Sequence, residues 1–286
     1  TTEIYTLSLH DALPIYFNGY IQPTPNIYPI CETIRWLATM PNIHGYFAEG
    51  SWNTRNAEFS SLRVWIIARM LWDPNTDYKA AIAEYCDAYY GPAGTYVKQY
   101  IDLMHESSAK TRAAIWEKTN IDSAMLSLDF VIKADALMEK AQAAVAADPV
   151  LLKHVMEVRV NVDYVILVRR KEYQDEAAGQ KIQFNLDFAN RLARFNQTLK
   201  DEGIKEYYQG GRVADLDKLI AIDRKDTTPP EMVRGLPKSG WSEIQEIGFN
   251  RYYGNTIVVP DALASDGAAA RLDGKEGAPL IQLKHH

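Results

Sequence analysis

Apolar residues recur every three or four positions along most of the chain, a spacing that predicts amphipathic helices. Pro29 is compatible with the first turn of a helix, and Pro41 stops that helix. In the first part of the chain the predicted helices cover residues 29–39, 57–72 and 78–90 and a stretch that runs from Pro92 through Met104. The turn residues of the segment 73–77 and Gly91 separate the later helices.

Two short apolar segments, residues 16–21 and 43–48, alternate with the first two helices. Both have the length of a strand, and the second ends at Glu49 and Gly50. The order strand, helix, strand, helix is typical of a parallel α/β unit. In such units the functional side chains lie at the carboxyl ends of the strands. The two predicted strand ends are therefore the first places to look for a site.

Residues 107–224 continue the helical pattern almost without interruption. Apolar stripes run from Phe130 to Val145, from Val155 to Val168 and from Phe184 to Leu199. We expect an antiparallel bundle of three or four helices, with charged side chains such as Asp135 and the run 169–171 on solvated faces. Beyond residue 227, the segments 241–249, 255–262 and 278–283 predict short strands, and 261–277 is expected to be a loop.

Composition narrows the classes of function. The net charge of −6 argues against a nucleic-acid-binding surface, which needs a basic patch. Cys31 and Cys86 belong to no metal or redox motif and are expected to be small buried residues, so no metal or other cofactor is predicted. No apolar run reaches the roughly 18 residues of a membrane span. The 17 tyrosines and 6 tryptophans suit a surface that holds sugars or other amphipathic ligands, and the alternative is that most of these rings belong to the core.

The candidate substrate-binding residues gather at the two predicted strand ends. The first end offers Asn18 and Tyr20. The second offers Glu49 and Trp52, and Tyr46 lies in the strand that leads to them. A carboxylate accepts hydrogen bonds from sugar hydroxyls, and an indole presents a flat apolar face to a sugar ring. The alternatives are structural roles: Glu49 as a helix cap or ion-pair partner, Asn18 as a turn residue and Tyr20 as a core ring.

Hydrolysis of a glycosidic bond needs two carboxylates that flank the bond. Glu49 is the one candidate that the sequence offers. Glu32 and Glu58 fall in predicted helices and are expected to be surface or capping groups. The catalytic residues therefore stay unassigned, and the sequence leaves open whether the protein is an enzyme.

The first 15 residues, TTEIYTLSLHDALPI, resemble the translation of a sequencing-library adapter. They also lack the basic and apolar regions of a secretory signal. We therefore expect the natural sequence to begin near Tyr16, within a larger domain, and we set His10 and Asp11 aside as site candidates.

Four segments carry a family resemblance: PTPNIYPICETIRWL, NIHGYFAEGSW, AEFSSLRVWIIARMLWDPNTD and EYCDAYYGPAGTYVKQYIDLMH. In this order they resemble the C-terminal part of a bacterial family, the domain of unknown function 4838, whose proteins are similar to glycoside hydrolases. The helix that ends ARMLW, after Glu49, is also similar to the last barrel unit of family-twenty β-hexosaminidases. There the glutamate binds substrate hydroxyls, so the resemblance implies that Glu49 binds substrate and that Trp52 forms a wall of the sugar pocket. It also implies a secreted or periplasmic location.

Taken together, the pattern and the resemblance predict an α/β plus α fold. Residues 16–106 are expected to form the last two β/α units of a (β/α)8 barrel, and 107–226 a helical bundle. Residues 227–286 resemble the start of a β-sandwich module of the carbohydrate-binding type. The expected function is sugar binding within a carbohydrate-active, glycoside-hydrolase-like protein, with this fragment inactive because its barrel is open. The alternative is a non-catalytic glycan-binding or scaffold protein.

Overall fold

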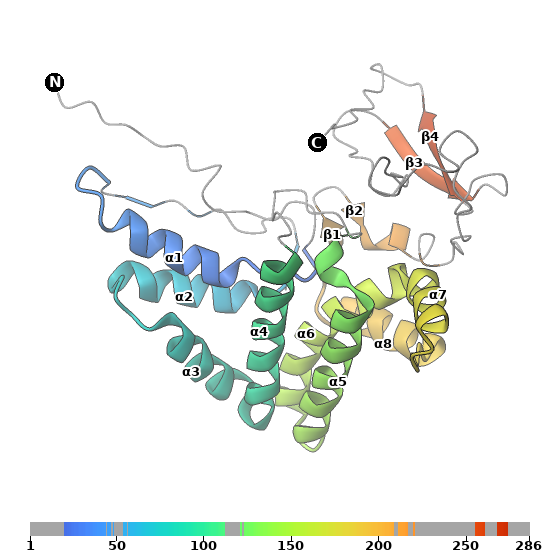
Figure 1. Ribbon diagram of the computed structural model, residues 1–286, viewed down its shortest axis with the longest axis horizontal. Coiled ribbons are helices and arrows are strands. Elements are labelled where there is room, and N and C mark those ends of the chain that lie inside the picture. The colour runs from blue at the N-terminus through green and yellow to red at the C-terminus, as the bar shows by residue number, and fades with distance from the viewer. Residues whose placement is uncertain are drawn as a thin grey trace. The chain divides into compact units, whose positions relative to one another are not determined.

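The computed structural model describes residues 20–43, 45–46, 48, 54–55, 57–111, 121, 123–208, 211–216, 220, 255–260 and 268–273. Within these residues helices dominate (Figure 1). The α-helices are α1 (Ile27–Leu37), α2 (Ser60–Trp72), α3 (Tyr78–Tyr90), α4 (Gly94–Thr111), α5 (Leu128–Ala144), α6 (Pro149–Val168), α7 (Arg170–Gln180) and α8 (Phe188–Asp201). The 3-10 helices are η2 (Gly91–Ala93), η3 (Ala124–Leu126) and η4 (Val213–Asp215), and the strands are β1 (Glu206–Tyr208), β2 (Gly211–Arg212), β3 (Asn255–Pro260) and β4 (Ala268–Asp273).

The chain divides into two compact units. One comprises Thr1–Leu167 and Asn185–Ala214, and it contains α1 to α5, nearly all of α6, α8 and the antiparallel hairpin β1–β2. The other comprises Val168–Phe184 and Asp215–His286 and contains α7 and the antiparallel hairpin β3–β4.

Side-chain caps explain where several helices begin. Asp77, Ser127 and Asp148 accept hydrogen bonds from backbone N–H groups in the first turns of α3, α5 and α6. At α1, Nε2 of His105 accepts a hydrogen bond from the Tyr28 N–H at 3.1 Å. Burial lowers the pKa of His105 to about 4, so this ring nitrogen stays free to accept the bond.

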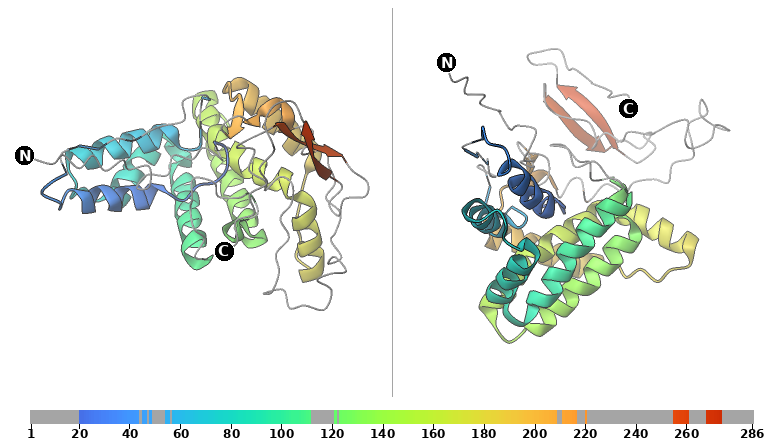
Figure 2. Two further views of the ribbon diagram at one scale, coloured as in Figure 1. Left: turned by 90° about the horizontal axis from the view of Figure 1, so that it is seen from above. Right: turned by 60° about the vertical axis from the view of Figure 1, so that its left-hand side comes forward.

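Helices α1 and α2 run side by side in the same direction (Figures 1 and 2). At their C-terminal ends, Arg35 donates hydrogen bonds to the carbonyl oxygens of Pro74 (3.2 Å) and Thr76 (2.9 Å), just beyond α2. At their N-terminal ends, Nε of Arg63 donates to Oδ1 of Asn26 at 2.8 Å. Polar contacts therefore fix both ends of this parallel pair.

Glu58 joins the N-terminal ends of α1 and α2 from inside the fold. Both of its carboxylate oxygens accept a hydrogen bond from the Thr24 N–H at 3.1 Å, and Oε2 accepts one from Nη2 of Arg63 at 2.7 Å. The residue is 2% exposed, and this burial raises its pKa to about 7 against the opposing effect of Arg63. The expectation of a surface or capping role for Glu58 was wrong, because the segment that covers it lies 34 positions away in the sequence.

The predicted fragment of a (β/α)8 barrel is wrong. Among the residues predicted as strands at 16–21 and 43–48, those that the structure describes form none. Tyr20 makes isolated backbone bonds in place of a ladder: its N–H donates to the Tyr207 carbonyl (2.9 Å), and its carbonyl accepts from the Glu58 N–H (2.7 Å). Pro23 and Pro25 lack the N–H groups that would extend a strand there. A short apolar segment does not by itself distinguish a strand from an extended connection.

The predicted start of a β-sandwich is also wrong for the described part of the C-terminal region. There, β3 and β4 pair as one two-stranded antiparallel hairpin, in register from Asn255 opposite Asp273 to Pro260 opposite Ala268. The predicted strand 255–262 is confirmed over residues 255–260, but the loop expected at 261–277 contains β4. The apolar run AAARL between two glycines was a hairpin signal that the alanine-rich composition obscured.

The apolar stripes predicted for the helices are largely confirmed. Leu62, Ile66 and Met70 of α2 are buried. All five valines of the α6 stripe are buried as well: Val155, Val158, Val162, Val165 and Val168. Trp72, the last residue of α2, is 92% exposed. The stripe predicted from Phe184 to Leu199 holds only in part, because Phe184 precedes α8 and Phe188 is 37% exposed. Cys31 and Cys86 are buried free thiols, as expected.

A cluster of five charged side chains, three of them buried and two partly exposed, lies where α5, α6 and α8 meet. We call Asp135, Arg159, Asp163, Arg191 and Arg194 the arginine–aspartate cluster. Asp163, whose side chain is fully buried, accepts from Nη1 of Arg191 at 2.6 Å and from Arg194 at 2.8 and 2.9 Å, and it pairs with Arg159 at 3.3 Å. Asp135 bonds to both Arg159 and Arg191. The solvated position expected for Asp135 was therefore wrong.

The run 169–171 was also expected on a solvated face. In the second unit, Arg169 and Arg170 are buried, and Arg169 forms an ion pair with Glu172. An arginine can bury its long apolar stem as well as its head, which charge alone does not reveal.

We predict that Asp163→Asn lowers the free energy of unfolding by about 3–5 kcal/mol, because it leaves three arginines around one buried carboxylate. Urea unfolding measures the effect. Asp129→Asn is the matched control: Asp129 pairs with Lys133 at the surface, and its loss should cost at most about 1 kcal/mol. Equal losses in the two variants would contradict the structural role of the cluster.

Glu58 should make stability depend on pH. Its pKa is higher in the folded chain than the ordinary 4.5, so the folded state holds the proton more tightly and stability is lost as the pH rises towards about 7. We predict that the unfolding free energy of the native protein, minus that of Glu58→Gln, falls by about 2–3 kcal/mol between about pH 5 and about pH 8. A difference that stays constant over this range for Glu58→Gln would disprove the assignment.

Candidate functional site

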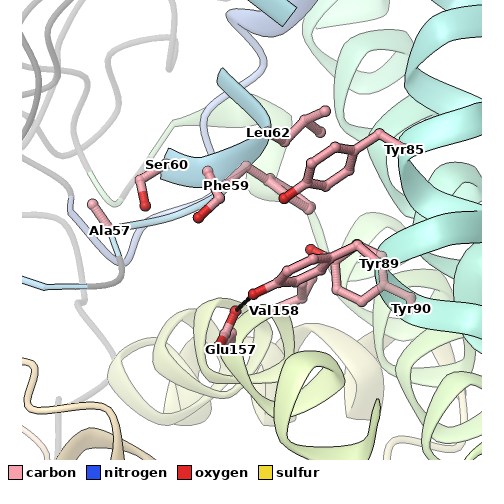
Figure 3. A pocket seen from close by; sticks show the side chains of 10 residues that line it. Ala57, Phe59, Ser60, Leu62, Tyr85, Tyr89, Tyr90, Glu157 and Val158 are labelled. Carbon is pink, nitrogen blue, oxygen red and sulfur yellow. Dashed lines mark hydrogen bonds between the residues drawn. The ribbon is translucent and has the colours of Figure 1, made fainter. Parts of the chain in front are cut away.

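A small pocket in the first unit lies between the turn that precedes α2, the second half of α3 and the middle of α6 (Figure 3). Its volume is about 20 Å³. A cavity of this size holds roughly one water-sized group. The lining residues are Ala57, Phe59, Ser60, Ser61, Leu62, Tyr85, Tyr89, Tyr90, Glu157 and Val158.

Four aromatic rings from three helices form a row beside the pocket. The ring of Trp65 in α2 lies 5.3 Å from that of Tyr85, which stacks on Tyr89 at 5.3 Å and 20°. Tyr89 in turn stacks on His154 of α6 at 3.9 Å and 12°. Figure 3 shows Tyr85 and Tyr89 reaching from α3 towards the turn before α2. The i, i+4 spacing of these two tyrosines places them on one face of α3 and makes the row possible.

The polar wall of the pocket consists of a carboxylate and hydroxyl groups. The Tyr89 hydroxyl donates a hydrogen bond to Oε2 of Glu157 at 3.1 Å (Figure 3). Ser61 forms a hydrogen bond with the hydroxyl of Tyr85, whose pKa burial raises to about 12. Burial raises the pKa of the Tyr89 hydroxyl as well, so both tyrosines stay protonated near neutral pH and act as neutral hydrogen-bonding groups.

Glu157 is held in an environment that disfavours its charge. Burial is the largest cause of its raised pKa, and the negative charge of Glu202, just after α8, is the next. Glu202 is itself buried and pairs with Lys153 at 3.5 Å. Among the described residues, the hydroxyl of Tyr89 is the hydrogen-bond partner of Glu157. One oxygen, Oε1, is thus left for a ligand.

A larger and more open hollow of about 470 Å³ lies between α4 and α5. Acidic groups of α4 and basic groups of α5 line it, and its lining contains no aromatic ring. It has the character of a solvated groove between neighbouring helices. The smaller pocket, which combines a carboxylate, hydroxyls and rings, is the better candidate for recognition of a ligand.

The structure describes two of the five residues predicted for the site, and neither of them lines the pocket. Asn18, Glu49 and Trp52 lie outside the described residues, so their roles stay predictions. Tyr20 is 2% exposed and does not line the pocket, which agrees with the alternative of a core ring. Tyr46 is half-buried away from the pocket lining, and its hydroxyl has no hydrogen-bond partner in the described part of the chain.

Sequence reasoning missed the residues that the pocket brings together. Tyr85 and Tyr89 belong to the predicted helix 78–90, and Glu157 lies in a valine-rich segment, but none of the three was a candidate for the site. The one available signal was the pair of tyrosines at i, i+4 directly before the turn Gly91-Pro92. No group of three His, Cys, Asp or Glu side chains suited to a metal occurs within the described ranges. No helix there is long and apolar enough to cross a membrane.

Comparison with known proteins gives one match. Residues 9–102 match the family described as Domain of unknown function (DUF4838). No curated protein and no solved structure matches the chain. The matched segment reaches into α4 and so includes Tyr85 and Tyr89, whereas Glu157 lies beyond it. Residues 9–102 are therefore similar to the family of domain of unknown function 4838, and the match supports the family resemblance predicted from the sequence for this part of the chain.

Proposed function

We propose that this protein binds a carbohydrate and that the pocket of Tyr85, Tyr89 and Glu157 receives one polar substituent of the sugar. The carrying observation is the combination of a half-buried carboxylate with tyrosine hydroxyls in a pocket of about 20 Å³. Carboxylates accept hydrogen bonds from sugar hydroxyls, and the tyrosine rings add apolar surface that a sugar can contact. The volume suits one substituent, so the sugar ring lies over the mouth of the pocket.

Glu49 and Trp52 precede the lining residue Ala57 by eight and five positions in the sequence. Thr54 accepts a hydrogen bond from the Lys205 N–H at 3.3 Å, and Ala57 is already part of the lining. We include Glu49 and Trp52 in the proposal as further sugar contacts, because they precede the pocket wall by only a few residues in the chain.

Between the two functions that the sequence leaves open, binding without chemistry is the better supported. Hydrolysis needs two carboxylates on either side of the bond, one of which gives up a proton. Near the pocket the described residues place Glu157 and Glu202, but Glu202 is buried and paired with Lys153. Only Glu157 is therefore available to a ligand in this part of the site.

We predict that Tyr89→Phe weakens sugar binding by about 1 kcal/mol, or roughly fivefold, because it removes the hydroxyl that orients Glu157 and keeps the stacked ring. A glycan array identifies the best-bound sugar, and titration calorimetry measures the affinities.

The matched control is Tyr96→Phe, since Tyr96 is half-buried on α4 and outside the pocket lining. Its affinity should equal that of the native protein. Absence of any bound glycan, or equal affinities in the Tyr89 variant and the native protein, would reject the proposed site.

A further inference from the structure

The pocket is rich in hydrogen-bond acceptors and in negative charge. Glu157 offers acceptor oxygens only, and Glu202 adds a second carboxylate nearby. Lys153 and His154 offset part of this negative charge. In the described part of the chain Lys153 pairs with Glu202, Nδ1 of His154 bonds to the Tyr89 carbonyl, and neither side chain bonds to Glu157. The Tyr89 hydroxyl donates its proton in a hydrogen bond to Glu157, and its oxygen can still accept a hydrogen bond from a ligand. A ligand group that brings several donors and a positive charge is therefore the best complement.

We propose that the substituent received by the pocket is a primary ammonium group, so that the ligand is a hexosamine with a free amine. This inference rests on the proposed function and adds the class of sugar to it. An ammonium group has three donors and no acceptor, whereas a hydroxyl has one donor. It can bond to Oε1 of Glu157 and to the oxygen of Tyr89 together, and its charge balances the carboxylate.

The size of the pocket separates the free amine from its acylated form. A volume of about 20 Å³ admits a group the size of water, as an ammonium group is. An acetamido group carries three additional heavy atoms and no charge. It would have to displace Phe59 or Leu62 from the wall to enter. The geometry thus selects against N-acetylated sugars by both volume and charge.

The experiment is titration calorimetry of the full chain near pH 7 with glucosamine, N-acetylglucosamine, glucose and methylamine. We expect glucosamine to bind about tenfold or more tightly than each of the other three, which corresponds to one charge-assisted hydrogen bond. In Glu157→Gln the advantage over glucose should disappear. In the control Glu139→Gln, an exposed glutamate of α5, it should remain.

Each other result overturns a defined part of the inference. Equal affinities for glucose and glucosamine, together with weakening of both by Tyr89→Phe, reject the ammonium group and keep the sugar site. Methylamine as tight as glucosamine rejects the sugar component. Failure of all three sugars to bind counts against the proposed function itself. The ligand series on the native protein decides these points even if Glu157→Gln does not fold.

Discussion

The rotation of α6 is the constraint on which the pocket depends, and the buried carboxylate of Asp163 sets that rotation. Asp163 and Arg159 lie four residues apart, on the face that meets α5 and α8. Glu157 precedes Arg159 by two residues, which turns it by about 200° around the helix. It therefore points away from the arginine–aspartate cluster and towards α3, where the Tyr89 hydroxyl meets it. A helix free to rotate would not hold this carboxylate against the aromatic row.

A second buried carboxylate, Glu58, fixes the pocket wall that Ala57 and Phe59 form before α2. It holds the chain before α1 against the start of α2, directly beside Phe59. Phe59 has a φ of 50°, in the left-handed region that a bulky side chain rarely adopts. Such a conformation costs on the order of 1–3 kcal/mol and persists only where its surroundings impose it. Here the burial of Phe59 and the bonds of Glu58 impose it, and both Ala57 and Phe59 face the pocket as a result.

A feature could be predicted from the sequence when it depends on residues close together in the chain, and not when it depends on residues far apart. The helices predicted in the first part of the chain and the valine stripe of α6 depend on neighbours within four residues, and these predictions are confirmed. The barrel was wrong because strand identity depends on a partner strand, which an apolar segment does not specify. The solvated position expected for Asp135 was wrong because its partner Arg191 lies 56 positions away. The pocket combines three such distant segments, so its members could not be predicted as a group.

The same long-range contacts explain why charge in this fold is informative about function. In the arginine–aspartate cluster every aspartate is bonded to at least two arginines, and Glu58 is bonded to Arg63. These carboxylates already have arginine partners within the fold, and a buried charge is tolerated when it is paired and hydrogen-bonded. Glu157 differs, because it has a neutral hydroxyl as its partner and a second carboxylate nearby. An arrangement that disfavours the bare charge is costly to stability, and a donor from outside the chain would relieve it. That contrast distinguishes Glu157 from the structural carboxylates as the one suited to a ligand.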